Sequence, residues 1–185
     1  MKNKKVILFP SILILVVLLV SMISVKGKLF PSLTAETLES KNITIPKDTK
    51  GKYTLVGLAY SQRAQEDLKT WLQPVYDVFI AKPTKPVLFE DGYDVNLYLV
   101  LMFTGSNESM VGAAKKKMQE LDAELKPHVL IYKGDIATYK EELALVEKDK
   151  PYFFVMDEEG KIVHTVSGPY SEAKMQKIEG LLEEE

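Results

Sequence analysis

Two nearly continuous apolar runs constrain the fold more than any other feature of this sequence. "YTLVGLAY" covers residues 53–60 and "VNLYLVLMF" covers residues 95–103. A strand with one solvated face alternates apolar and polar residues, so runs without this alternation indicate strands buried on both faces, as in a parallel sheet. Parallel strands need a long crossover, which is usually a helix. The segment between the runs has apolar residues at helical spacing, at Leu68, Leu72, Val75 and Phe79. The sequence therefore predicts a β-α-β unit.

The rest of the chain continues this alternation. We expect a helix over residues 111–125, a short strand at "HVLIY" and a short helix that begins at Asp135. "PYFFVMDEEGKIVHTVSG" predicts two strands joined by a turn at residues 157–160, where a glycine supplies positive φ, and Ser171 should cap a final helix. Pro74 should kink the first helix, because its ring displaces a backbone hydrogen bond. The predicted fold class is α/β, with a mixed sheet flanked by helices and a C-terminal β-hairpin plus helix.

The N-terminal segment has the pattern of a membrane anchor. "MKNKK" precedes residues 6–25, which are uncharged and mostly apolar. As a helix, a run of about 20 residues spans roughly 30 Å, the thickness of a hydrocarbon core. More lysines lie before this transmembrane helix than after it, which favours a cytoplasmic N-terminus and a domain on the extracytoplasmic, periplasmic side. The alternative is a signal peptide that is cleaved near residues 21–24 and releases a secreted protein.

These patterns divide the chain into three parts. Residues 1–28 form the membrane anchor or signal segment. Residues 29–52 read as a spacer with a small β-hairpin, because β-prone pieces at residues 33–38 and 42–45 lie within a stretch rich in Lys, Thr, Ser and Pro. Residues 53–185 form the α/β domain.

The charge of the chain argues against nucleic acid as a partner. The sequence has 24 Lys and Arg against 26 Asp and Glu. Five of the lysines flank the apolar run, so the remainder has 19 basic and 26 acidic residues and a net charge of −7. Because phosphate contacts need clustered Lys and Arg, we expect no nucleic-acid binding.

The chain contains no cysteine. This excludes disulfides, thiolate nucleophiles and cysteine-ligated metals. The two histidines, His128 and His164, lack the spacing of a metal site. Neither is placed by the sequence next to Ser61, which as a nucleophile would need a base. We therefore expect no catalytic residue, no metal and no cofactor.

The C-terminal stretch "KPYFFVMDEEGKIVHTVSGPYSEAKMQKIEGLL" resembles the end of a thioredoxin-fold protein. The upstream "IPKDTKGKYTLVGLAYS" resembles the peroxiredoxin and membrane-anchored thioredoxin branches of that superfamily. The resemblance implies a thioredoxin-like domain in which Pro151 would be the family's cis-proline. In redox-active members the loop after the first central strand holds a Cys-x-x-Cys pair. Here that loop is "SQRAQE", residues 61–66, so disulfide exchange and thiol peroxidase chemistry are excluded.

A weaker likeness links the chain to the mitochondrial ATP-synthase assembly factors of the same fold. "LKTWLQPVYDVF" and "HVLIYKGDI" carry it. It implies an alternative function, assembly of a membrane protein complex such as ATP synthase. A further alternative is a cysteine-independent enzyme on a thioredoxin scaffold.

The loop after the first strand is the candidate binding site. Arg63 is the only arginine of the chain, and the backbone N–H groups at a helix start together with its guanidinium can hold a carboxylate. The alternative for Arg63 is an ordinary exposed loop residue. Redox-active members of the superfamily bind their substrates in a groove beside this loop. Peptide binding could therefore be retained in a chain that has lost the thiols. The predicted partner-binding residues are Tyr60, Ser61, Gln62, Arg63, Gln65 and Pro151.

The expected function follows from these features. We expect a membrane-anchored, redox-inactive thioredoxin-like protein that acts as an extracytoplasmic binding, adaptor or chaperone-like module. Its partners would be a protein or an extended peptide segment, with the membrane reached through the N-terminal helix.

Overall fold

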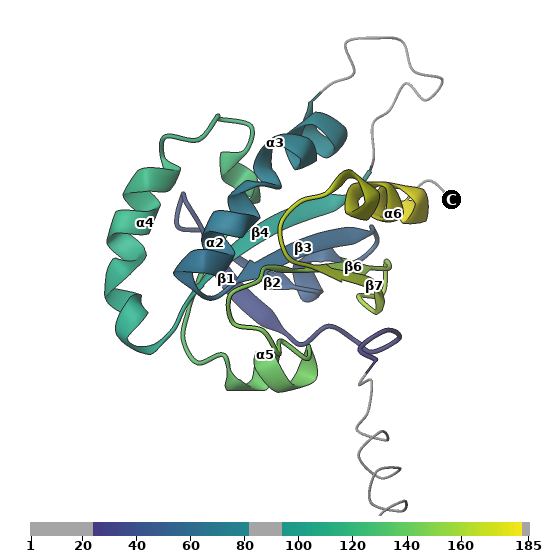
Figure 1. The fold of residues 1–185 in the computed structure, drawn as a ribbon, viewed down its shortest axis with the longest axis horizontal. Helices are drawn as coiled ribbons and strands as arrows, with labels where there is room; N and C mark the ends of the chain where they lie inside the picture. The colour runs from purple at the N-terminus through teal and green to yellow at the C-terminus, as the bar shows by residue number, and fades with distance from the viewer. Residues whose placement is uncertain (1–23, 82–93, 183–185) are drawn as a thin grey trace, which may run out of the picture.

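The computed structural model describes residues 24–81 and 94–182 (Figure 1). The predicted transmembrane helix falls almost entirely outside these ranges. Within them, no helix has the length and hydropathy needed to cross a membrane. The strands are β1 (Leu33–Thr37), β2 (Asn42–Ile45), β3 (Thr54–Ala59), β4 (Asn96–Phe103), β5 (Val129–Lys133), β6 (Tyr152–Met156) and β7 (Ile162–Ser167). The α-helices are α2 (Gln62–Lys69), α3 (Leu72–Val75), α4 (Val111–Met118), α5 (Ala137–Glu142) and α6 (Glu172–Leu182).

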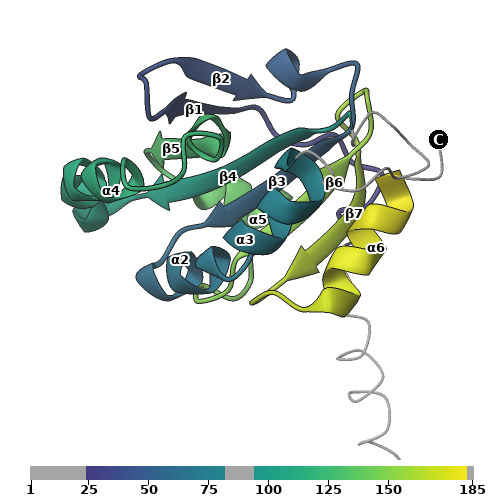
Figure 2. The ribbon, with the colours of Figure 1, turned by 90° about the horizontal axis from the view of Figure 1, so that it is seen from above.

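The strands form one mixed sheet in the order β2-β1-β5-β4-β3-β6-β7, with the β1–β2 hairpin at one edge and β7 at the other (Figure 2). β3, β4 and β5 are parallel, and the other pairings are antiparallel. The predicted mixed sheet is confirmed. The hairpin expected between residues 33 and 45 is present, and its strands belong to the main sheet.

Each face of the sheet has its own apolar core. Side chains of α2, α3 and α6 pack on one face, where Trp71 and Phe153 are the largest buried residues. α5 and the chain that follows it cover the other face, which holds Phe30 and Phe154 (Figure 1). Because β3 is buried on both faces along its whole length, its sequence shows no polar alternation.

The first helix is interrupted one turn before Pro74. α2 ends at Lys69, α3 begins at Leu72, and a π-helical turn, Tyr76–Ile80, follows. The break lies at Thr70 and Trp71, one turn before Pro74, and Thr70 carries the carbonyl whose hydrogen bond a proline at position 74 cannot supply, so the predicted interruption by Pro74 agrees with this break. Pro74 falls in the first turn of α3, where its missing N–H removes no intrahelical hydrogen bond.

The second predicted helix is shorter than expected. A 3₁₀ helix, Gly105–Met110, leads into α4, which ends at Met118 rather than at residue 125. Residues 119–125 form turns, and another 3₁₀ helix, Lys126–His128, precedes β5. The helix was predicted too long because Leu121 and Leu125, which lie beyond its end, also pack against the core and so continue the apolar spacing.

The turn between β6 and β7 matches its prediction. The Asp157 carboxylate accepts hydrogen bonds from the N–H groups of Glu159 at 3.1 Å and Lys161 at 2.8 Å. Gly160 has φ +86°, the left-handed conformation expected of it. The Asp157 side chain therefore closes the turn.

Residues 24–30, which we call the strap, are fixed to this hairpin. The Gly27 N–H donates to Ile162 O at 2.7 Å, the Ile162 N–H donates to Lys28 O at 2.8 Å, and the Phe30 N–H donates to Gly160 O at 2.9 Å. Val25 and Phe30 are buried, and the Phe30 ring meets Phe154 edge-on at 5.6 Å. The strap is thus part of the folded domain, although it lies within the predicted anchor and spacer.

Candidate functional site

The start of α2 forms the centre of the candidate site. Ser61 is the N-cap, and its Oγ accepts a hydrogen bond from the Ala64 N–H at 3.0 Å. Ser61 is buried, whereas Gln62 and Arg63 in the first turn are exposed. A polar N-cap after an apolar strand explains why the helix begins here. The Ser61 hydroxyl therefore has a structural role that the sequence alone did not reveal.

An open groove of about 380 Å³ lies in front of this turn. Three chain segments line it: the first turn of α2, the 3₁₀ helix after β4 and the turn before β6. The lining residues are Ser61, Gln62, Arg63, Glu66, Asn107, Lys148 and Asp149. These segments meet because β3 and β4 run parallel and end at the same edge of the sheet, where β6 begins.

The charges of the groove are mixed. Arg63 pairs with Asp67 at 3.4 Å and lies 3.9 Å from Glu66 on the same helix. The Asp67 side chain is only 14% exposed, but the Arg63 side chain is 66% exposed, so its guanidinium can also reach another carboxylate. On the other wall, Lys148 and Asp149 are exposed, and within the described part of the chain their backbone N–H groups have no hydrogen-bond acceptor. The groove thus offers donors and acceptors suited to an extended peptide.

The structure brings only part of the predicted set into this groove. Ser61, Gln62 and Arg63 line it, whereas Gln65 is half-buried on α2 and does not. Tyr60 packs on the opposite face of the sheet, where its hydroxyl donates to Leu145 O at 3.0 Å. Burial raises the pKa of the Tyr60 hydroxyl to about 12, which keeps it protonated.

Pro151 is buried and does not line the groove, and its carbonyl accepts a hydrogen bond from the Gly168 N–H at 2.9 Å. The expectation that Pro151 follows a cis peptide bond is wrong. Among the described residues, the cis peptide bond is Ile45–Pro46.

Sequence reasoning missed the other groove residues, Glu66, Asn107, Lys148 and Asp149. Asn107 comes shortly after the end of β4, and Lys148 and Asp149 come shortly before Pro151. The position of Asn107 follows from the predicted order of elements, because the ends of parallel strands meet at one edge, whereas Lys148 and Asp149 reach the groove through the antiparallel pairing of β6 with β3. No motif marks the residues themselves.

The sheet register separates both histidines from Ser61. His128 precedes β5 beside the start of β4, where its Nδ1 lies 3.0 Å from Leu97 O. His164 is opposite Val155, which in turn pairs with Leu55 near the start of β3. Ser61 follows the other end of β3. Neither histidine can therefore act as its base, and no group of metal ligands occurs within residues 24–81 and 94–182.

We predict that His164 makes the free energy of unfolding depend on pH. Its Nε2 is buried without a hydrogen-bond partner, and burial, then Lys177 and Lys26, lower the pKa of its imidazole below 6.5. Below pH 6.5 the unfolded chain binds this proton more readily than the folded one, so the free energy of unfolding should fall as the pH decreases. Urea unfolding across this range measures the slope. His164→Gln should reduce it and His128→Gln should retain it; equal slopes in the wild type and His164→Gln would contradict the assignment.

Comparison with solved structures identifies the fold. A thiol:disulfide interchange protein from Bacteroides sp. aligns with 19% identity and a TM-score of 0.55 over 85% of this chain and 90% of that chain. A putative thiol:disulfide interchange protein DsbE from Chlorobium tepidum gives 17% identity and a TM-score of 0.54 over 85% and 97%. The sequence matches no protein-family model and no curated protein.

The chain therefore has a thioredoxin-like fold and lacks the cysteines of a thiol:disulfide exchange site. At this level of identity the likeness carries the fold alone. Disulfide exchange through its own thiols is chemically excluded.

Proposed function

We propose that this chain is a membrane-anchored, redox-inactive thioredoxin-like module whose domain faces the extracytoplasmic side and binds an extended segment of an envelope or membrane protein. The groove formed by α2, Asn107 and the turn at Lys148 and Asp149 supports this proposal. It has exposed polar side chains on both walls and lies where the fold brings three segments together.

Several features favour binding over chemistry in this groove. The only hydroxyl among its lining residues belongs to Ser61, which is occupied as a helix cap. Both histidines lie toward the other end of the sheet. Binding of a main chain needs only donors, acceptors and a shaped surface, all of which the groove offers.

Anchoring and sidedness rest on the sequence. Residues 6–23, which precede the strap, are 18 uncharged residues, within the length range that crosses a bilayer, and the lysine distribution favours a cytoplasmic N-terminus. A tethered domain also gains a high effective concentration toward other proteins of the same membrane.

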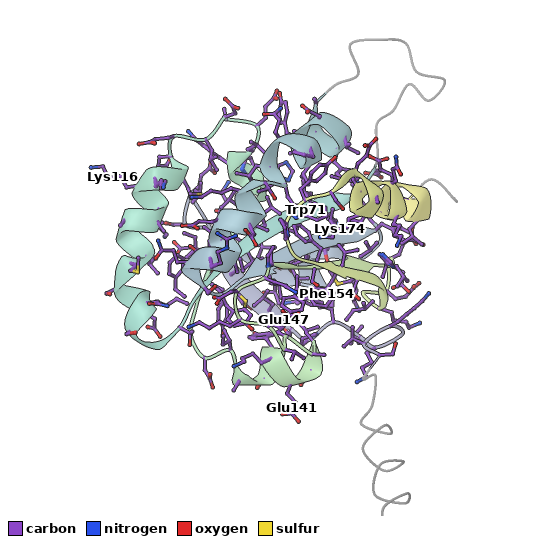
Figure 3. The ribbon with its side chains drawn as sticks, viewed as in Figure 1. Trp71, Lys116, Glu141, Glu147, Phe154 and Lys174 are labelled. Atoms are coloured by element: carbon purple, nitrogen blue, oxygen red, sulfur yellow. The ribbon has the colours of Figure 1, made fainter. Side chains whose placement is uncertain are left out.

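Photocrosslinking in the native host tests the groove. A crosslinker at position 107 should give a discrete protein adduct, and a crosslinker at Lys116, which points outward from α4, should give none (Figure 3). The double variant Gln62→Ala with Arg63→Ala should weaken the adduct at position 107, because it removes the side chains of the opposite wall. Its fold should survive, since both side chains are exposed.

Two results would reject the groove: equal adducts at positions 107 and 116, or an adduct that the double variant leaves unchanged. Mass spectrometry of the adduct separates the remaining functions. One dedicated membrane subunit indicates an assembly factor for a membrane complex, whereas a mixed set of clients indicates a chaperone. A small molecule that stays with the purified protein would favour a cysteine-independent enzyme.

A further inference from the structure

The strap leaves no linker between the domain and the apolar run. Val25 is 7% exposed and packs in the core, and the turn closed by the Lys28 N–H and Val25 O at 3.1 Å fixes the chain next to it. Three hydrogen bonds then join the strap to residues 160–162. Val25, the last residue of the predicted membrane-spanning run, is therefore held in place within the folded domain.

The length of the remaining run sets the distance to the membrane. Residues 6–23 are 18 uncharged residues. As a helix they rise about 27 Å, slightly less than the roughly 30 Å of a hydrocarbon core. Each residue not needed to span the hydrocarbon core could lengthen the connection between membrane and domain by at most about 3.5 Å. Residues 6–23 leave no such residue. The point where the chain leaves the domain must therefore lie at the level of the lipid headgroups.

From this we propose that the strap holds the domain directly against the bilayer surface, with one face toward the lipid headgroups, rather than on a flexible tether. This inference rests on the membrane anchor of the proposed function. The partner of this face is the headgroup region of the bilayer that contains residues 6–23.

The residues around Ser24 define that face. Ser24, Val25 and Lys26 line a cavity of about 240 Å³ together with Leu143 and Ala144 of the chain after α5 and residues 165–167 of β7. Val146, two residues beyond Ala144, is 85% exposed, which is unusual for a large apolar side chain and suits a membrane interface. Lys26 and Lys28 are exposed and form no ion pair within the described residues, so they can bind lipid phosphates.

The same chain segment connects this face to the groove. Ala144 lines the cavity at the strap, and Lys148 lines the groove. Four residues span at most about 14 Å. The groove therefore opens close to the membrane surface. Juxtamembrane segments of integral membrane proteins lie at the same level and are the nearest partners for it.

Site-specific fluorescence quenching tests this placement on the full chain. Because the chain has no cysteine, Val146→Cys and Lys116→Cys each provide a single labelling site. The labelled proteins are reconstituted in phosphatidylcholine and phosphatidylglycerol vesicles that contain a lipid with a nitroxide on its headgroup. α4 lies on the far side of the domain from the strap (Figure 1), so quenching at position 146 should exceed that at position 116 several-fold.

A Gly-Ser spacer inserted between residues 23 and 24 should abolish this difference, and the same spacer between residues 5 and 6 should preserve it. Equal quenching at positions 146 and 116 without a spacer would overturn the inference, as would a difference that survives the spacer at residue 23. Flotation of the vesicles tests the anchor separately. If the protein does not float, the anchor and the inference both fail; if it floats without selective quenching, only the inference fails.

Discussion

Replacing Trp71 with alanine should lower the free energy of unfolding by about 3–5 kcal/mol, the range for truncating a large buried aromatic side chain. Trp71 is fully buried, at 0% exposure, between α3 and the chain that leads into α6 (Figure 3). Its ring lies 4.1 Å from the Phe153 ring and 5.5 Å from the Tyr170 ring. Its Nε1–H donates to Gly168 O at 3.1 Å. The alanine variant would lose these contacts together and leave a cavity.

Trp71→Phe separates packing from hydrogen bonding. Phenylalanine keeps an aromatic ring against Phe153 but leaves Gly168 O without its buried donor, a loss of about 1–3 kcal/mol. Urea unfolding followed by far-ultraviolet circular dichroism measures both variants, since Trp71 is the only tryptophan and its fluorescence is lost. If Trp71→Ala cost no more than Trp71→Phe, the contacts of the Trp71 ring with Phe153 and Tyr170 would not stabilise the fold.

The central strands could be predicted from sequence because burial on both faces leaves a continuous apolar run. For the first helix, Pro74 predicted an interruption but not the exact position of the break between α2 and α3. This position depends on partners far along the chain: the Tyr170 N–H donates to Thr70 Oγ1 at 2.9 Å, and Trp71 bonds to Gly168. The spacing of apolar residues indicates which face of a helix is buried. It does not indicate where hydrogen bonds with a distant segment end the helix.

The groove illustrates a second limit. Gln62 and Arg63 could be placed because they follow an apolar strand in a fold with a recognisable C-terminal end. Lys148 and Asp149 look like any polar turn, and only the antiparallel pairing of β3 with β6 brings them opposite α2. The prediction that Tyr60 lines the groove is wrong. Side chains alternate between the two faces along β3, and the Tyr60 side chain lies on the face away from the groove.

Gly160→Ala should destabilise the protein by about 2–5 kcal/mol, the sum of a left-handed backbone for a non-glycine residue and of overpacking. Gly160 has φ +86°, and an added Cβ would lie 2.5 Å from Pro46 Cβ and 2.8 Å from Pro46 Cγ. Both atoms belong to a ring that cannot rotate away. Gly160 O also accepts the Phe30 N–H of the strap, so any shift of this turn would weaken the attachment of the strap.

Gly51→Ala is the matched control, because Gly51 has φ +85° and an added Cβ there would meet nothing within 4 Å. It should cost only the backbone term of about 1–2 kcal/mol. The difference between the two variants in urea unfolding therefore measures the contact of residue 160 with Pro46. Equal losses would mean that the turn and Pro46 move apart freely, and that the strap is joined to a deformable hairpin. A larger loss at Gly160 would show that Pro46 holds in place the turn to which the Phe30 N–H of the strap is bonded.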